Sequence, residues 1–187
     1  MDSHISYANN FLIAIPTAYQ SIYSHSVVYL CEHSAHGAIG MIINHPMPVY
    51  LQLMFEQLAI HVSDPIINQK PLLFGGPVQP ERGFVIHRPS GHFHASLTMS
   101  KDVMLTTSSD IIRAIATHGG PHDPIITLGY TGWQANQLEL ELANNAWLVC
   151  PFSADLLYDV PYEKRWQFAG SILGVQMNQI STQIGHS

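Results

Sequence analysis

Residues 26–33, which read SVVYLCEH, form the stretch that most constrains the fold. The β-branched and aromatic residues in this stretch predict a strand. Alternation along a strand places four side chains on one face: Val27, Tyr29, Cys31 and His33. Both faces stay apolar until Glu32, so the strand should lie in the middle of a sheet that is covered on both sides. The turn residues SAHG and the apolar run 38–44 then complete a predicted hairpin.

Other apolar runs predict the remaining strands, at residues 9–16, 71–78, 82–87, 102–108, 124–130 and 146–152. Helical spacing, capping residues and prolines near first turns predict helices at residues 49–60, 110–119, 134–145, 153–160 and 161–174. Strands and helices are mixed without a strict βαβ alternation. This order predicts an α+β fold rather than a doubly wound parallel sheet.

A length of 187 residues and a hydrophobic content of 47% suit one compact domain with its own core. We assign residues 10–174 to this domain, residues 1–9 to an N-terminal tail and residues 175–187 to a C-terminal tail. The segment MDSHISYANN lacks a positive region, and FLIAIP after it is too short for a signal peptide or a membrane span. We therefore expect a cytoplasmic protein without membrane contact, with Cys31 and Cys150 as free thiols.

The charge of the chain argues against direct nucleic-acid binding. The formal net charge is −6, and the seven Lys and Arg residues are dispersed along the sequence. Phosphate neutralisation supplies most of the affinity in non-specific nucleic-acid binding, and this sequence shows no cationic stripe that could do so. Only 11% of the residues are charged, which leaves room for a surface that contacts another protein.

Seven motifs in order resemble those of the YqgE/AlgH family, whose common label is regulator of transcription. They are VVYLCEH, GAIGMIINHP, FGGPV, RGFVIH, TTSSDII, LGYTGWQANQLELEL and NAWL. The resemblance runs from about Phe11 to Gly174. It implies a single compact α+β domain in which a mixed, bifurcated β-sheet forms a pseudo-barrel flanked by several helices. No set of catalytic or DNA-contacting residues comes with it.

Two positions depart from the family pattern. His45 stands before a proline where the family more often has Arg, Lys or Gln, which removes a permanent cation and weakens any anion site near Asn44. Asn136 stands where the family usually has Gly, inside a helix or at its entry, at little backbone cost. Neither change should abolish the fold.

Cys31 is the first candidate for chemistry. A Cys in the middle of an apolar strand is usually a small buried side chain. The alternative is a reactive or redox thiol, with His33 on the same face as a base or orienting group. A metal site could combine Cys31 and His33 with His36 and either His45 or His87, but this spacing matches no established site. We therefore predict no metal and no cofactor.

The segments FGGPV and LGYTGW are the second candidate, because glycines in loops allow backbone N–H groups to approach a ligand. We interpret LGYTGW as a loop that leads into a helix. The candidate ligand-binding residues share these motifs or the neighbouring NHP motif: Asn44, Gly75, Gly76, Gly129, Tyr130 and Trp133. The alternative is that the glycines make tight turns in a crowded sheet, with Trp133, Trp147 and Trp166 packed in the core.

The sequence contains no catalytic fingerprint such as GxSxG, GxGxxG or a Walker lysine. Together with the low charge and the family resemblance, this predicts a regulatory protein that acts through contacts with an unidentified partner protein and has no catalytic machinery. The alternative hypothesis is a Cys31-dependent thiol enzyme or redox sensor with a small-ligand pocket.

Overall fold

The computed structural model describes residues 4–16 and 21–183 of the chain. The strands in these ranges are β1 (Phe11–Ala14), β2 (Val27–Ser34), β3 (Gly37–Ile42), β4 (Pro46–Tyr50), β5 (Pro71–Phe74), β6 (Val78–His87), β7 (Ser96–Thr98), β8 (Met104–Thr106), β9 (Ile125–Gln134) and β10 (Trp147–Cys150). The α-helices are α1 (Leu51–Gln57), α2 (Pro65–Asn68), α3 (Asp110–Ala116), α4 (Gln137–Ala143), α5 (Arg165–Ile172) and α6 (Met177–Gln183). A π-helical turn (Asp155–Asp159) and a 3-10 turn (Tyr162–Lys164) precede α5. No described helix is long and apolar enough to cross a membrane.

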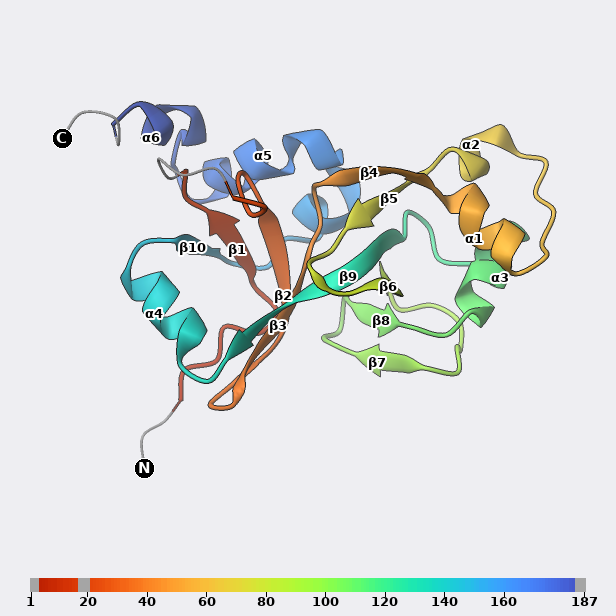
Figure 1. Cartoon of the computed structure of the whole chain (residues 1–187), viewed down its shortest axis with the longest axis horizontal. Coiled ribbons are helices and arrows are strands. Elements are labelled where there is room, and N and C mark those ends of the chain that lie inside the picture. The colour runs from red at the N-terminus through yellow and green to blue at the C-terminus, as the bar shows by residue number, and fades with distance from the viewer. Residues whose placement is uncertain (1–3, 17–20, 184–187) are drawn as a thin grey trace.

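The strands form one curled sheet that forks at β9. Its main path follows the order β10-β1-β2-β3-β9-β6-β8-β7. The C-terminal half of β9 pairs with β3, whereas its N-terminal half pairs with β6 and, in parallel, with β5. Strands β5 and β4 form the second branch of the fork, in which β4 pairs with β5 as the outer strand (Figure 1). The predicted α+β fold with a bifurcated sheet is confirmed, and the sheet curls into a half-barrel.

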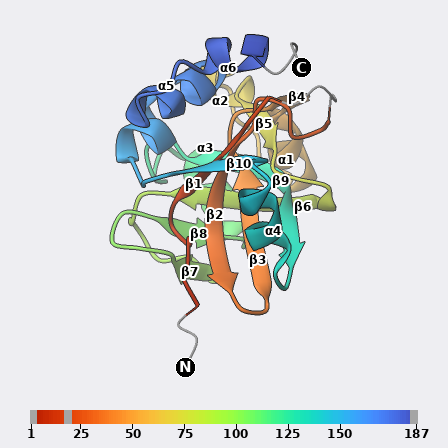
Figure 2. The same ribbon diagram turned by 90° about the vertical axis from the view of Figure 1, so that its left-hand side faces the viewer.

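Three apolar clusters fill the spaces between the sheet and its helices. One lies between β1–β3 and α5, the second between the opposite face of these strands and α4, and the third among α1, α3, β5 and β6. Figure 1 shows α4 on one side of the sheet and α1 to α3 at its far end, while Figure 2 shows α5 and α6 together above it. Trp133, Trp147 and Trp166 are each buried in a cluster, as predicted.

Strand β2 is the central element of the first two clusters. Every residue from Val27 to Cys31 is buried, and β2 pairs with β1 on one side and β3 on the other. Side chains on its two faces therefore enter different clusters, Tyr29 in the first and Leu30 in the second. The predicted hairpin and the burial of β2 on both faces are confirmed.

The predicted alternation along β2 is wrong at its C-terminal end, because a β-bulge interrupts it. Leu30 pairs with Gly40 and Glu32 pairs with the next residue, Ile39, so Cys31 is an extra residue without a partner on β3. An extra residue reverses the side-chain alternation that follows it. His33 is thereby moved to the face opposite Cys31.

The prediction of a loop at LGYTGW is also wrong. Residues 125–134 form the single strand β9, whose last residues pair with β3. Thr131 and Trp133 are buried while Gly132 and Gln134 are exposed, which is strand alternation. The glycines resemble turn signals, but in β9 Gly129 allows close contact with another backbone segment and Gly132 is an exposed strand residue.

Several helices are shorter than predicted. Helix α4 begins at Gln137 because Gln134 belongs to β9, and the segment predicted as a helix at 153–160 contains a π-helical turn. The prolines before α1 lie in edge strand β4 rather than at the helix start. Asn136 enters α4 with a left-handed φ of 64°, a conformation that Asn tolerates better than most residues other than Gly.

Residues outside the predicted domain boundaries contact the domain. Residues 4–9 run beside β2, where the Asn9 N–H donates to the Leu30 carbonyl at 2.8 Å. At the other end, Met177 of α6 is buried in the first cluster and lies against Gly170. The boundaries at residues 10 and 174 stay a prediction, and residues 1–3 and 184–187 of the predicted tails lie outside the described residues.

Candidate functional site

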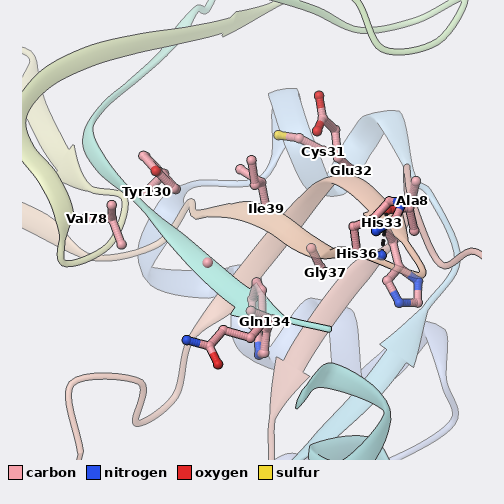
Figure 3. A pocket seen from close by; sticks show the side chains of 14 residues that line it. Ala8, Cys31, Glu32, His33, His36, Gly37, Ile39, Val78, Tyr130 and Gln134 are labelled. Carbon is pink, nitrogen blue, oxygen red and sulfur yellow. Dashed lines mark hydrogen bonds between the residues drawn. The ribbon is translucent and has the colours of Figure 1, made fainter. Parts of the chain in front are cut away.

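An open cleft of about 720 Å³ lies where β2, β3 and β9 meet. Figure 3 shows it from close by, with Ile39 and Tyr130 on its floor and Val78 at its edge. The cleft brings together four of the predicted site residues: Cys31, His33, Tyr130 and Trp133. Asn44 and the predicted glycines at 75, 76 and 129 do not line it.

Cys31 lies at the inner wall of the cleft as a buried thiol. Only 9% of the residue is exposed, and its Sγ lies 3.2 Å from the Met41 sulfur. Burial, followed by the negative charge of Glu32, raises the pKa of the Cys31 thiol to about 12. The thiol therefore stays protonated at neutral pH, and its packing role is the one the sequence favoured.

The bulge separates Cys31 from its predicted partner. In Figure 3 the Cys31 sulfur and the Glu32 carboxylate extend together from β2, while His33 points away from them. His33 lies opposite Ala38, whose side chain belongs to the cluster beneath α4, whereas Cys31 belongs to the cluster on the other face. The prediction that His33 acts on the Cys31 thiol as a base is therefore wrong.

His33 instead joins β2 to α4 and to the N-terminal segment. Its side chain is fully buried, its Nδ1 accepts a hydrogen bond from the Tyr7 N–H at 3.0 Å, and its Nε2 lies 2.8 Å from a Glu139 carboxylate oxygen. Because Nδ1 is an acceptor, Nε2 must carry the proton and donate it to Glu139. Partial desolvation raises the pKa of Glu139, but hydrogen bonds from its own backbone N–H and from the His33 and His4 rings outweigh this, so the pKa is lowered.

The described residues place one set of metal-ligand types together: His4, His33 and Glu139, with ligand atoms within 4.8 Å of one another. Zinc accepts two His and a carboxylate. A neutral His ligand, however, needs its second ring nitrogen to be protonated and to donate a hydrogen bond. His33 has the opposite arrangement, so this set is a hydrogen-bonded cluster. Sequence reasoning missed the roles of His4 and Glu139, because no local pattern links positions this far apart.

Two backbone segments pass close to each other at the three predicted ligand-binding glycines, Gly75, Gly76 and Gly129. We call this place the strand crossing. A Cβ on Gly129 would lie 2.2 Å from the Gly76 carbonyl oxygen, and one on Gly75 would lie 2.3 Å from that of Gly129. The Thr131 hydroxyl donates to the Gly75 carbonyl at 3.3 Å. The space that a ligand would need is filled by the opposing strand, so the tight-packing alternative is the one that the structure supports.

The side-chain amide of Asn44, the remaining predicted ligand-binding group, is also engaged within the protein. Its side-chain oxygen accepts from the Val27 N–H at 2.8 Å, and its side-chain nitrogen donates to the His25 carbonyl at 2.7 Å. Both ends of the amide therefore hold the start of β2 in place. We assign Asn44 a structural role.

The protein is thus an α+β half-barrel with an open cleft at the fork of its sheet. The sequence model of the AlgH-like family matches residues 11–178, and the chain belongs to this family. A UPF0301 protein of Legionella pneumophila is 52% identical over 182 residues, 97% of each chain. Another from Thioalkalivibrio sulfidiphilus is 44% identical over 187 residues, the full length of both.

Two solved structures share the fold. The solution structure of the AlgH protein from Pseudomonas aeruginosa superposes with a TM-score of 0.79 at 37% identity, covering 100% of this chain and 99% of that one. The crystal structure of protein DIP2367 from Corynebacterium diphtheriae gives a TM-score of 0.73 at 16% identity, covering 97% and 94%. The second match supports the fold alone. The family resemblance inferred from the motifs is thereby confirmed.

Proposed function

We propose that this protein is a cytoplasmic regulator that acts by binding an extended segment of a partner protein in the cleft between β2, β3 and β9. The observation that carries the proposal is the composition of the cleft. Its floor contains the partly exposed side chain of Ile39 beside Tyr130, the exposed side chain of Val78 lies at its edge, and the rest of its rim is polar. An apolar centre with a Tyr and a polar rim is typical of surfaces that bind proteins.

The charge of the cleft favours a basic partner segment. Among the residues that the structure describes, Glu32 is the only carboxylate that lines the cleft, and none of the lining residues is Lys or Arg. Within the described residues, Glu32 has no ion-pair partner. A Lys or Arg of the partner would supply the missing charge, whereas phosphates of a nucleic acid would be repelled.

A thiol-dependent activity gains no support from this geometry, because Cys31 is buried and His33 lies on the other face of β2. The same cleft could accept a small ligand, but its open shape and exposed rim suit a chain segment better. We therefore propose that the protein regulates its partner through noncovalent binding rather than through thiol chemistry.

The test is capture of a partner from a bacterial lysate by the full chain, with and without Glu32→Lys. The matched control is Glu56→Lys, which makes the same charge change on exposed α1, away from the cleft. We expect one protein to be captured by the unaltered chain and by the control, and to be lost with Glu32→Lys. Equal capture by all three would place binding elsewhere, and a mobility shift with tight, sequence-dependent DNA binding at low salt would overturn the proposal.

A further inference from the structure

A second cavity, of about 330 Å³, lies between the sheet and α4 and has a different chemistry from the cleft. Three aromatic rings from separate parts of the chain line it: Tyr23 before β2, Trp133 of β9 and Trp147 of β10. We call it the aromatic chamber. Figure 2 shows α4 in front of the strands that form its back wall.

The Trp147 ring stands at a steep angle to each of the other two rings. The ring centroids of Trp133 and Trp147 are 6.0 Å apart with an interplanar angle of 74°, and those of Tyr23 and Trp147 are 5.8 Å apart at 68°. The three rings that line the cavity therefore meet edge to face and do not form one stack. Boxes of aromatic rings of this kind bind organic cations through the negative faces of their π systems.

Glu141 adds a fixed negative charge to the chamber. One of its carboxylate oxygens accepts hydrogen bonds from the Nε1–H groups of Trp133 and Trp147, both at 2.8 Å. The other oxygen accepts from Gln137 at 3.0 Å. No Lys, Arg or His among the described residues forms an ion pair with Glu141. The carboxylate is thus held rigidly, without a cation to balance it.

We propose that the aromatic chamber binds the quaternary ammonium group of a small organic cation. Three hydrogen bonds already occupy Glu141, so few acceptors remain for a ligand that must donate N–H groups. A quaternary ammonium has no N–H to donate and needs only ring faces and a nearby negative charge. The volume of the chamber lies at the lower end of the range of small-ligand pockets, about 300–1,000 Å³.

The test uses choline chloride as the probe and the neutral alcohol of the same shape, 3,3-dimethylbutan-1-ol, as its control. The side-chain N–H signals of the tryptophans are followed by NMR, with sodium chloride added to hold ionic strength constant. We expect choline to move the signals of Trp133 and Trp147 saturably, and the alcohol to bind at least about 10-fold more weakly. Trp166 does not line the chamber and its ring lies in the first cluster, so its signal should move less than those of Trp133 and Trp147.

Two matched variants test the role of the charge. Glu141→Gln removes the carboxylate charge but keeps an oxygen that can accept the indole N–H groups, and should weaken choline binding at least about 10-fold. Glu139→Gln makes the same change on the same helix and should leave choline binding unaltered. If Glu141→Gln does not fold, as judged by its NMR spectrum, Tyr23→Leu removes one partly exposed wall and should weaken binding instead.

Three results would overturn the proposal: no saturable shift with choline, equal binding of choline and the alcohol, or equal affinity of the two Glu variants for choline. A trimethyllysine derivative distinguishes the source of the ligand. If this derivative binds more tightly than choline, the natural ligand is a methylated side chain of another protein. The proposal that the chamber binds a quaternary ammonium group is supported in either case.

Discussion

Cys31 and His33 are two residues apart in β2, yet their side chains lie on opposite faces of the strand, because the extra residue in the bulge reverses the alternation between them. Cys31 packs against Met41 on one face, while His33 bonds to Glu139 on the other. The same bulge brings Glu32 to the side of the thiol, where its charge opposes formation of a thiolate. Each side chain can therefore be tested separately.

The Cys31 thiol should resist alkylation in the folded protein. Burial raises the pKa of Cys31 to about 12 and that of Cys150 to about 11, so both thiols stay protonated between pH 7 and pH 9. We expect iodoacetamide to modify neither residue in this range and to modify both after unfolding in guanidinium, as followed by mass spectrometry. Rapid alkylation of Cys31 with an apparent pKa below the value of about 8.5 for a free thiol would revive the enzyme hypothesis.

His33 should be neutral with its proton on Nε2. The Tyr7 N–H occupies Nδ1 as a donor, which leaves Nε2 to donate to Glu139. The ¹⁵N chemical shifts of the ring, measured at pH 7.5 through long-range couplings, distinguish this tautomer from the other. An equimolar addition of zinc should leave the shifts unchanged. A proton on Nδ1, or a zinc-dependent shift of the His33 signals, would mean that His4, His33 and Glu139 form a metal site.

A side chain at Gly129 should destabilise the strand crossing. Gly129 has a φ of 73°, and an added Cβ would lie 2.2 Å from the Gly76 carbonyl oxygen. Gly174 is a matched control, because its φ is 70° but nothing lies within 4 Å of an added Cβ. Gly174→Ala should cost about 1–2 kcal/mol for the left-handed backbone alone. Gly129→Ala should cost about 1–3 kcal/mol more, from overpacking.

Urea unfolding followed by tryptophan fluorescence gives both free energies of unfolding. Equal losses for the two variants would show that the backbones can separate at little cost, and would reopen the crossing as a place where a ligand could enter. Gly129→Ala should also leave the mean structure away from the crossing intact, which far-ultraviolet circular dichroism checks.

Asp110, at the start of α3, should stabilise the fold in a pH-dependent way. Partial desolvation raises its pKa, but hydrogen bonds from Ser108 and His94 outweigh this and lower the pKa to about 2. A carboxyl whose folded pKa lies below the unfolded value of about 3.9 contributes stability above pH 3.9 and loses it as the pH falls toward 2. We expect the difference in Tm between the unaltered chain and Asp110→Asn to be constant from pH 6 to pH 5 and to shrink toward pH 2.

Ser108→Ala provides the companion measurement, because it removes one of the hydrogen bonds that lower the pKa of Asp110. In this variant the folded pKa of Asp110 lies closer to the unfolded value, so the pH-dependent loss of stability should be smaller and should be complete at a higher pH. A Tm difference between the unaltered chain and Asp110→Asn that stays the same down to pH 2 would show that the carboxylate charge makes no contribution.

The parts of the fold that the sequence predicted are those with a strong local pattern. The β-branched run of β2, the turn that follows it and the helix after Ser109 each carry their signal within a few residues. The burial of Cys31 followed from the apolar residues around it. None of these predictions required knowledge of a distant contact.

The parts that the sequence missed depend on distant contacts. The bulge at Cys31 exists because β3 offers one residue fewer along the pairing, which no pattern within β2 reveals. The extension of β9 through Gly132 depends on β3 as a partner, and without it the glycines resemble turn signals. The partners of His33 and the ring box around Glu141 likewise come from segments that only the folded chain brings together.

The forked sheet also determines the order in which strands can pair while the chain is being synthesised. The hairpin of β2 and β3 leaves the ribosome early, but the open edge of β3 is paired by residues 131–134 of β9, and the open edge of β1 by β10 near residue 150. Strands β1 and β3 are strongly apolar, and each therefore keeps an unpaired edge until the last third of the chain has been synthesised. Nascent chains that stop before residue 134 should for this reason depend on chaperones, whereas the full-length chain can close both edges by itself.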